Sequence, residues 1–391
     1  MQPKIIHIIT DLNGFGGAEN TLFRYLNHHK DHLENHFVVV LKTLGVNNTV
    51  GLKFKELGID ILELNLDRFI RWFSSPFRFA SVIIKFRPNI ISAWLYHSIL
   101  FVEIFRIFIP RKIKIVWQIR SLPFNNSRGM RFYIKNAVYK FIAFLSHRKN
   151  LTIVSNSLAS KEAHEEIGFF IKNWIIISNG VDSTLYSINP IDRINIRNSM
   201  GIDNNDILIC AIGRFVPQKG YKFLFNAINM SSCIKKLRST RRVCFIGVGS
   251  DISIENESLM KLALSSFNLK DLYLLGRRFD IPVILGISDL FIHASISESS
   301  PNVILEAMAS GLIISATNVG DVGKLGLENK FLANPKDLTS LSMAIDYGLN
   351  LSEHDKNITI IKQKNIVKSN FDINTTINKF DFIFNKLLLE D

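Results

Sequence analysis

Two glutamates, Glu298 and Glu306, stand eight residues apart in the segment ESSPNVILE. Serine is favoured just before a helix and proline at its first position, so Ser300 and Pro301 predict a helix start here. The free backbone amides at such a helix end attract phosphate groups. Asn302 and Glu306, four residues apart, would then share one face of the helix.

These residue types suit a ligand that carries both a sugar and a phosphate. A carboxylate at Glu306 would hold the two hydroxyls of a ribose, because both of its oxygens accept hydrogen bonds. Glu298, in the loop before the helix, would reach the hydroxyls of a second sugar. The segment alone also fits an ordinary capped helix with a solvated glutamate, so the hypothesis needs support from other segments.

A second charged segment is AIGRFVPQKG, in which Arg214 and Lys219 follow a strand-like run and precede a helical pattern. A departing nucleoside diphosphate carries several negative charges. Two cations at the carboxyl end of a strand would stabilise those charges as a glycosidic bond breaks, without a metal ion. Taken alone, an Arg and a Lys in a loop are also typical of a solvated surface.

Glycines stand at the first strand-to-helix turn, where NGFGGAE contains Gly14, Gly16 and Gly17. Glycine permits positive φ and lets the backbone approach a phosphate or a sugar closely. Any tight turn would use glycine as well. Gly247 and Gly249 in FIGVGSD lack the third glycine of a dinucleotide-binding fingerprint, and we interpret them as a plain turn.

Strand-like apolar runs that alternate with helical patterns must position these side chains. In the first half of the chain the runs lie at residues 4–10, 36–42, 59–65, 89–95, 112–120, 151–156 and 174–180. The polar stretch 187–206 interrupts this rhythm, and we interpret it as a connection between domains that leads into a helix. Further runs lie at residues 206–215, 241–249, 272–277, 290–295 and 312–317. This alternation indicates parallel sheets covered on both faces.

A length of 391 residues is typical of two domains rather than one. We therefore predict an α/β protein with two Rossmann-like domains, whose parallel sheets face each other across a cleft. The ligand is expected at the carboxyl ends of the strands. The predicted domains are an acceptor-side domain at 1–185 and a donor-nucleotide-binding domain at 186–372, followed by a C-terminal helix at 373–391 that is free to pack back on the first domain.

The composition is that of a folded globular protein, with 47% apolar and 21% charged residues. The three cysteines, Cys210, Cys233 and Cys244, lack metal-site spacing and are predicted to be buried free thiols, as in a reducing compartment. The N-terminus shows no export signal. The longest stretch without a charged side chain, from Pro88 to Val102, is shorter than a membrane span. We expect a cytoplasmic protein.

The net charge of +13 belongs mainly to the first half of the chain. Residues 1–185 hold 24 Lys and Arg against 13 Asp and Glu, and residues 63–149 hold 16 against 3. Ser75 is predicted to cap a helix that carries Arg78 and Lys85 on one stripe beside aromatic residues. Basic amphipathic helices of this kind bind anionic membrane surfaces. Scaffold helices that happen to be basic are the alternative.

Several of these segments, taken in order, carry a family resemblance. GGAE, SNGVD at 178–182, GR followed by KG, IGVGS, LLGR, and ESSPNVILEAMASG followed by VGD resemble the family 4 (group 1) retaining glycosyltransferases of the GT-B fold. The resemblance covers nearly the whole chain. Its most specific element is the pair of glutamates with seven residues between them.

The resemblance implies roles for named residues. Arg214, Lys219 and Glu298 would carry the catalytic step, the two cations on the donor diphosphate and the glutamate on the transferred sugar. Donor contacts would come from Gly16, Gly17, Arg277, Ser299, Ser300, Asn302, Val303 and Glu306, with Arg277 near the nucleobase and Glu306 on the ribose. Such enzymes retain the anomeric configuration, which implies a front-face displacement without metal or cofactor.

The chain also departs from the family pattern. Many members carry a histidine just after a strand of the first domain, where this chain has Arg120 in VWQIRSL. His97, in AWLYHSI, is a further candidate on the acceptor side, and a core or capping histidine is the alternative.

The leading hypothesis is a glycosyltransferase that moves a sugar from a nucleotide-sugar donor to a saccharide or lipid-linked acceptor. It would serve cell-surface polysaccharide or lipopolysaccharide biosynthesis as a cytoplasmic, peripheral membrane enzyme. One alternative is a nucleotide-sugar epimerase on the same fold, for which no acid and base pair is visible. The others are a non-catalytic nucleotide-sugar-binding protein and a nucleic-acid binder, which lacks a recognition motif beyond its charge. Nucleic acid is therefore not an expected partner.

Overall fold

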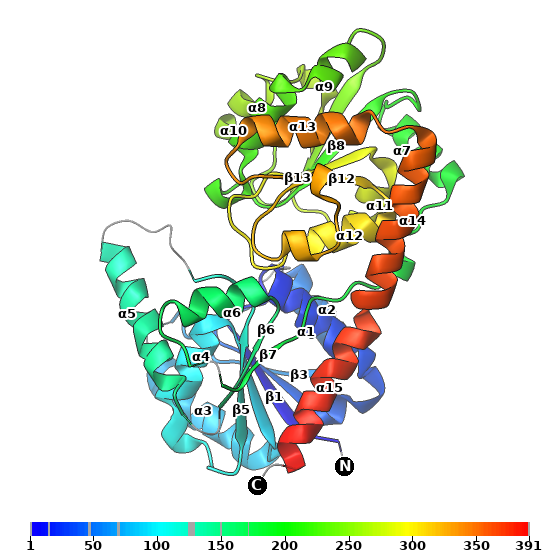
Figure 1. Ribbon diagram of the computed structural model, residues 1–391. Coiled ribbons are helices and arrows are strands. Elements are labelled where there is room, and N and C mark those ends of the chain that lie inside the picture. Colours follow the sequence, from blue (N-terminus) through cyan, green and yellow to red (C-terminus); the bar gives the residue numbers. More distant parts are fainter. Residues whose placement is uncertain are drawn as a thin grey trace. The chain divides into compact units, whose positions relative to one another are not determined.

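The computed structural model divides into two compact units, each with its own sheet (Figure 1). Unit 1 comprises residues 1–179 and 376–391, and unit 2 comprises residues 180–375. The structure describes residues 2–14, 16–45, 48–68, 71–123, 130–148, 151–170 and 172–389. The chain thus changes unit six residues before the first boundary expected from the sequence and three residues after the second.

Unit 1 is built on a seven-stranded parallel sheet with the order β3-β2-β1-β4-β5-β6-β7. Its strands are β1 (Ile5–Ile9), β2 (His36–Val40), β3 (Asp60–Glu63), β4 (Ile90–Trp94), β5 (Lys114–Ile119), β6 (Leu151–Ser155) and β7 (Trp174–Ile176). Each strand lies within a predicted run, because strands covered on both faces are mainly apolar. The prediction of a parallel α/β domain is confirmed.

Helices cover both faces of this sheet. They are α1 (Gly17–His28), α2 (Thr49–Glu56), α3 (Arg71–Phe86), α4 (Leu95–Ile104), α5 (Met130–Leu145), α6 (Leu158–Glu165) and α15 (Ile373–Leu389). Phe79 of α3, Ile99 of α4 and Ile142 of α5 join one apolar core with the strands. The opposite face carries α1 and α15, whose Tyr25 and Phe380 rings pack against each other.

The start of α3 differs from the sequence prediction. Ser75 was expected to cap the helix, but α3 begins at Arg71 and Pro76 lies inside it. The Ser75 hydroxyl is buried and donates a 2.6 Å hydrogen bond to the carbonyl oxygen of Arg71. A serine within a helix can bond the carbonyl one turn earlier, so the Ser-Pro pair imitated a helix start.

Unit 2 is built on a six-stranded parallel sheet with the order β10-β9-β8-β11-β12-β13. Its strands are β8 (Ile207–Ile212), β9 (Val243–Val248), β10 (Leu272–Leu274), β11 (Leu290–His293), β12 (Ile313–Thr317) and β13 (Leu332–Ala333). The first five were predicted. A two-residue strand such as β13 has no pattern that a sequence can reveal. Numbered within their units, the strands of both sheets follow the Rossmann order.

The helices of unit 2 also form two layers. They are α7 (Pro190–Ser199), α8 (Tyr221–Met230), α9 (Ser232–Leu237), α10 (Glu257–Ala263), α11 (Ile281–Ile287), α12 (Asn302–Ser310), α13 (Leu338–Leu349) and α14 (Glu353–Asn370). Helices α7, α11, α12 and α14 contribute to the apolar core on one face of the sheet. Helices α8, α9, α10 and α13 contribute to the core on the other face.

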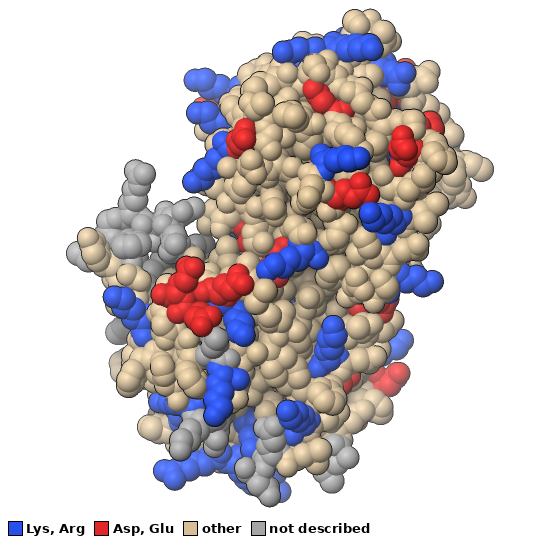
Figure 2. Space-filling view, viewed as in Figure 1, with Lys and Arg blue, Asp and Glu red and all other residues tan. Residues whose placement is uncertain are grey.

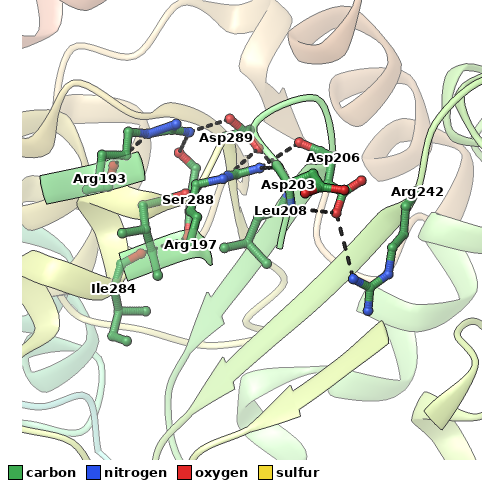
Figure 3. Close-up of polar contacts among 11 residues, drawn as sticks. Arg193, Arg197, Asp203, Asp206, Leu208, Arg242, Ile284, Ser288 and Asp289 are labelled. Carbon is green, nitrogen blue, oxygen red and sulfur yellow. Dashed lines mark hydrogen bonds and ion pairs between the residues drawn. The ribbon is translucent and has the colours of Figure 1, made fainter. Parts of the chain in front are cut away.

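The polar stretch 187–206 is an anchored part of unit 2, so its interpretation as a connection between domains was wrong. It forms α7, and the Arg197 side chain on this helix is fully buried (Figure 3). Its guanidinium donates to the carbonyl oxygens of Ile287 at 2.8 Å, Asp203 at 2.8 Å and Asp206 at 2.7 Å. Asp289, just before β11, accepts from Arg193 at 2.6 Å and from Arg197 at 3.2 Å. The helix expected in this stretch is present, but the polar composition gave no sign that a buried cation holds it to the sheet.

The C-terminal helix α15 belongs to unit 1 from Thr376 onward. The Tyr25 hydroxyl of α1 donates to Asp381 at 2.9 Å, and the Phe380 ring packs against Trp94 of β4. The last segment of the chain therefore completes the cover of the first sheet.

Candidate active site

The charged side chains that the sequence singled out stand at the carboxyl edge of the unit 2 sheet. Arg214 and Lys219 follow β8. Arg277 follows β10, and Glu298 follows β11. Glu306 lies on α12, the helix that connects β11 to β12. Since these strands are parallel, their carboxyl ends meet at one edge, which is where ligands of such folds bind.

Backbone hydrogen bonds join the loops at this edge. The Phe215 amide donates to the carbonyl oxygen of Ser250 at 2.9 Å, which links the loops after β8 and β9. The Ile296 amide donates to the carbonyl oxygen of Gln218 at 2.7 Å, which links the loops after β8 and β11. The loops are therefore fixed by the fold itself, as electrostatic catalysis requires.

Two glycines bring neighbouring loops into close contact. Gly220 has a φ of 65°, and a Cβ there would lie 2.0 Å from the carbonyl oxygen of Ala294. Gly320 has a φ of 58°, and a Cβ there would lie 2.1 Å from the carbonyl oxygen of Glu298. Only glycine fits these positions without strain or collision. The β8 and β12 loops thereby pack directly against the β11 loop.

Glu298 and Lys219 form an ion pair at the centre of this edge. The Lys219 ammonium lies 2.5 Å from Oε1 of Glu298. The Ser295 hydroxyl donates to the same oxygen at 2.8 Å, and Nε2 of His293 lies 3.6 Å from it. Three polar side chains therefore lie close to one carboxylate oxygen of Glu298.

These neighbours set the protonation states. Burial alone raises the pKa of Glu298, but the contact with His293 and the charge of Lys219 outweigh burial and lower that pKa to about 2. Burial lowers the pKa of His293 below its usual value, and the nearby Glu298 carboxylate offsets this only in part. At neutral pH the site thus holds an ionised glutamate and a neutral histidine.

Helix α12 begins one residue later than expected. Pro301 has an extended ψ of 116° and occupies the position before the helix, so Asn302 is the first helical residue and Ser300 is not the cap. Within the described residues no side chain caps the helix. The first amides of α12 can therefore bind an anion, as the sequence suggested.

The remaining predicted donor residues surround the start of α12. Ser299, Ser300, Val303 and Glu306 are buried, and Asn302 shares the helix face of Glu306 one turn earlier. The Asn302 side-chain oxygen is also buried, and within the described residues it accepts no hydrogen bond.

Two arginines stand at the rim of the same edge. Arg214 is exposed, whereas Arg277 donates a 2.7 Å hydrogen bond from its Nε to the Ser250 hydroxyl of the neighbouring loop. Unit 2 therefore brings together nine of the thirteen predicted site residues at one sheet edge.

The other four predicted site residues belong to unit 1. Gly16 precedes α1 in an extended conformation and Gly17 is its first residue. His97 is exposed on α4. Arg120 follows β5 and is buried, its guanidinium donating to Asn179. Burial lowers the pKa of Arg120 to about 9. The functional roles of all thirteen residues stay predictions.

Two side chains of the site were not expected from the sequence, His293 and Ser295. The available signal was the run FIHAS, whose last strand residue precedes Glu298 by five positions. In the described part of the chain, this edge included, no group of three or more His, Cys, Asp or Glu side chains could hold a metal ion. Cys210, Cys233 and Cys244 are free and buried, as expected.

The segment that carries this edge is similar to known glycosyltransferases. Residues 192–365 match the family model described as glycosyl transferases group 1. A protein of Bacillus subtilis (strain 168), provisionally named a teichuronic acid biosynthesis glycosyltransferase, TuaC, is 26% identical over 216 residues, which are 54% of this chain and 50% of that one. The Escherichia coli UDP-Gal:alpha-D-GlcNAc-diphosphoundecaprenol alpha-1,3-galactosyltransferase is 29% identical over 205 residues, 49% of this chain and 51% of that one. The chain spans about half the length of the curated relatives it matches.

The fold is shared over the full length. The crystal structure of Anabaena Alr3699/HepE in complex with UDP and glucose has a TM-score of 0.81 to this chain at 20% identity, and covers 98% of this chain and 100% of its own. The resemblance drawn from the sequence motifs is confirmed. The chain has the GT-B fold, and its residues 192–365 match the family model of the glycosyl transferases group 1.

Proposed function

We propose that this chain is a retaining glycosyltransferase that moves a sugar from a nucleotide-sugar donor to a saccharide or lipid-linked saccharide acceptor. The observation that carries the proposal is the ionised Glu298, held beside Lys219 at the carboxyl edge of the unit 2 sheet. The names of the two curated relatives support it, one specifying teichuronic acid biosynthesis and the other a diphosphoundecaprenol-linked acceptor. The pathway would be synthesis of a cell-surface polysaccharide or lipopolysaccharide.

The reaction is a front-face displacement. Arg214 and Lys219 stabilise the donor diphosphate as the bond between its oxygen and the anomeric carbon breaks. The acceptor oxygen bonds to the same face of that carbon, and its proton passes to the departing phosphate oxygen. Glu298 accepts hydrogen bonds from hydroxyls of the transferred sugar. The protein thus supplies charge and orientation, without a nucleophile, a metal ion or a cofactor.

The donor's other parts have matching partners in unit 2. The free amides at the start of α12 suit the diphosphate, and the buried Glu306 suits the ribose diol. Arg277 would lie near the nucleobase. Ser299, Ser300, Asn302 and Val303 complete the donor set, with Gly16 and Gly17 of unit 1. His97 and Arg120 are assigned to the acceptor side.

The test is product formation with a panel of nucleotide sugars and a membrane extract that supplies acceptors. We expect one donor to give a glycosylated product and free nucleoside diphosphate. Arg214→Ala and Glu306→Ala should remove both. Transfer that is unchanged in these two variants would overturn the assignment of the donor site.

The same assay separates the alternatives. An epimerase would interconvert the nucleotide sugar without an acceptor and without releasing nucleoside diphosphate. A non-catalytic binding protein would retain the donor and form no product. Neither alternative has a specific observation in its favour.

We also infer a membrane-facing surface on unit 1, which we call the α3–α5 face. Phe73, Phe77 and Ile84 of α3 are 73%, 71% and 72% exposed, and Tyr133 and Phe144 of α5 are 70% and 73% exposed. Both helices contribute to the core on one face of the sheet. Aromatic side chains in this number are unusual on a free surface and typical of a membrane interface.

Charge supports an anionic lipid surface as the partner. Figure 2 shows Lys and Arg gathered over unit 1 at the lower end of the view. Arg71 and Lys85 of α3 and Lys140 of α5 are exposed among the apolar residues. Within the described residues no helix is long and apolar enough to cross a membrane. The enzyme would therefore work at the inner face of the cytoplasmic membrane, where a lipid-linked acceptor is within reach.

A further inference from the structure

His293 is a buried ionisable group to which the proposed chemistry gives no role. It ends β11 and is only 3% exposed. Its Nε2 lies 3.6 Å from Oε1 of Glu298, beyond hydrogen-bond length, and within the described residues neither ring nitrogen makes a hydrogen bond. The imidazole therefore lies beside a carboxylate without being committed to another partner.

The two charged side chains beside His293, Glu298 and Lys219, neutralise each other. The negative charge of Glu298 is matched by the Lys219 ammonium at 2.5 Å. With this pair intact, a proton on His293 would add an unmatched positive charge to a buried site. Burial and the Lys219 charge accordingly keep the pKa of His293 low, against the attraction of Glu298. The imidazole stays neutral in this arrangement.

The proposed function makes two demands on Lys219. Its ammonium contacts Glu298 here, and it must also neutralise the donor diphosphate. A diphosphate oxygen offers a stronger charge-assisted partner, so the ammonium would move toward it. The largely buried Glu298 carboxylate would then lose its cation, which is unfavourable unless another positive charge replaces it. The nearest group that can become positive is His293.

We propose that His293 takes up a proton when a nucleoside diphosphate draws Lys219 away from Glu298, so that an imidazolium replaces the ammonium as the partner of the carboxylate. The proton comes from a solvent hydronium ion, whose O–H bond breaks as the N–H bond forms on a ring nitrogen, and no bond of the protein breaks. His293 is thus a positioning residue that keeps Glu298 ionised and in place for the sugar. This inference rests on the proposed function, because it needs Lys219 to bind the donor.

Few other ionisable groups surround the ring. Glu298 and Lys219 are the charged groups that act on it. Strand β8 contributes the buried Cys210, and β12 contributes no ionisable side chain. Helix α12 packs on the same face of the sheet as His293 and contributes the buried Glu306. On the other face, Asp346 of α13 accepts a hydrogen bond from the Cys233 amide at the start of α9. Within the described residues, His293 is therefore the neutral group beside Glu298 that becomes positive on taking up a proton.

The test is a titration of the histidine ring signals in the full-length protein by NMR, with ¹³C-labelled histidine. His293→Gln identifies the His293 signal. UDP, GDP and ADP are the ligands, each added to saturation. We expect the nucleotide that binds to raise the titration midpoint of His293 by about one pH unit or more, because a positive charge leaves the neighbourhood of the ring.

Two variants test whether the rise in the His293 midpoint comes from the departure of Lys219 from Glu298 or from an unrelated effect of nucleotide binding. Lys219→Met should raise the His293 midpoint without any nucleotide, because it removes the same positive charge permanently. Glu298→Gln should abolish the nucleotide-dependent rise, since no carboxylate then needs a partner. Binding of a nucleotide with an unchanged midpoint in the wild type would overturn the inference and leave the donor site intact. Failure of all three nucleotides to bind would overturn the proposed function, and the inference with it.

Discussion

The six strands of the unit 2 sheet follow the same order as the first six of unit 1, but the carboxyl edges of the two sheets use charge differently. In unit 2 the charged side chains of separate loops approach one another, and Glu298 pairs with Lys219. In unit 1 the Asp67 carboxylate binds the amide and the hydroxyl of Thr43, and Arg120 is buried against the rings of Trp94 and Phe380. One edge therefore offers charge to a ligand, while the other uses charge to hold its own loops and helix α15.

The largest effect should follow from removing a cation of the unit 2 edge. Lys219→Met should lower kcat about a hundredfold or more, because it removes charge stabilisation from the departing diphosphate. The matched control is Lys42→Met in unit 1, whose ammonium pairs with Asp11 at 3.4 Å. Steady-state kinetics with the donor found in the panel measures both. Equal losses of kcat in the two variants would contradict the proposed difference between the two edges.

The next effect concerns stability, because removing the buried cation of α7 should lower the free energy of unfolding of unit 2. Arg197→Met removes the guanidinium that donates to three backbone carbonyl oxygens and takes one of the two arginine partners from Asp289. The free energy of unfolding of unit 2 should therefore fall by about 3 kcal/mol. Arg193→Met, which removes a partly exposed side chain, should cost less. Hydrogen exchange of unit 2 peptides measures the change. Tryptophan fluorescence should report unit 1 unchanged, since all four Trp lie there.

Acid should weaken unit 1 through its buried histidines. Burial, with the charge of His29, lowers the pKa of His36 to about 4, so the unfolded chain binds this proton more readily than the fold does. The stability contributed by neutral His36 is complete above about pH 6.5 and is lost as the pH falls toward 4. The urea midpoint of tryptophan fluorescence should therefore fall between pH 7 and pH 5. In His36→Gln this fall should be smaller, and an identical fall would remove His36 as its cause.

The smallest effect concerns the α3–α5 face of unit 1. Phe73→Ser with Phe77→Ser should reduce flotation with liposomes containing anionic lipid about threefold or more, because both rings are exposed and apolar. Ile254→Ser with Leu269→Ser removes comparably exposed side chains from unit 2 and should change nothing. Binding should weaken with added salt. If the wild-type protein bound neither liposomes with anionic lipid nor liposomes without it, the membrane proposal would be wrong.

The sequence predicted those parts of the fold that leave a periodic pattern. Twelve of the thirteen strands lie within the strand-like runs predicted from the sequence, which are mainly apolar. The polar stretch that contains α7 was misinterpreted, because a buried Arg197 looks solvated in a sequence. Ser75 and Ser300 were taken as helix caps, since the same Ser-Pro pair can stand inside a helix or before it.

The candidate site was also predicted only in part. Lys219 and Glu298 were predicted individually, as a cation after one strand and an acid after another. Their ion pair could not be predicted, because it depends on loops held together at Gly220 and Gly320. His293 was not predicted as a site residue for a related reason. A histidine at the end of an apolar run does not indicate that a carboxylate lies beside it in the fold.

The most direct test of the account is nucleotide binding at the unit 2 edge, measured by titration calorimetry with UDP, GDP and ADP. The wild-type protein should bind one of them, and Arg214→Ala should bind it at least about tenfold more weakly, as expected for the loss of a phosphate-binding cation. Arg278→Ala is the control, because its guanidinium pairs with Asp280 at 2.6 Å, and its affinity should be unchanged. Equal affinity of Arg214→Ala and the wild type, or binding of none of the three nucleotides, would contradict the assignment of this edge as the donor site.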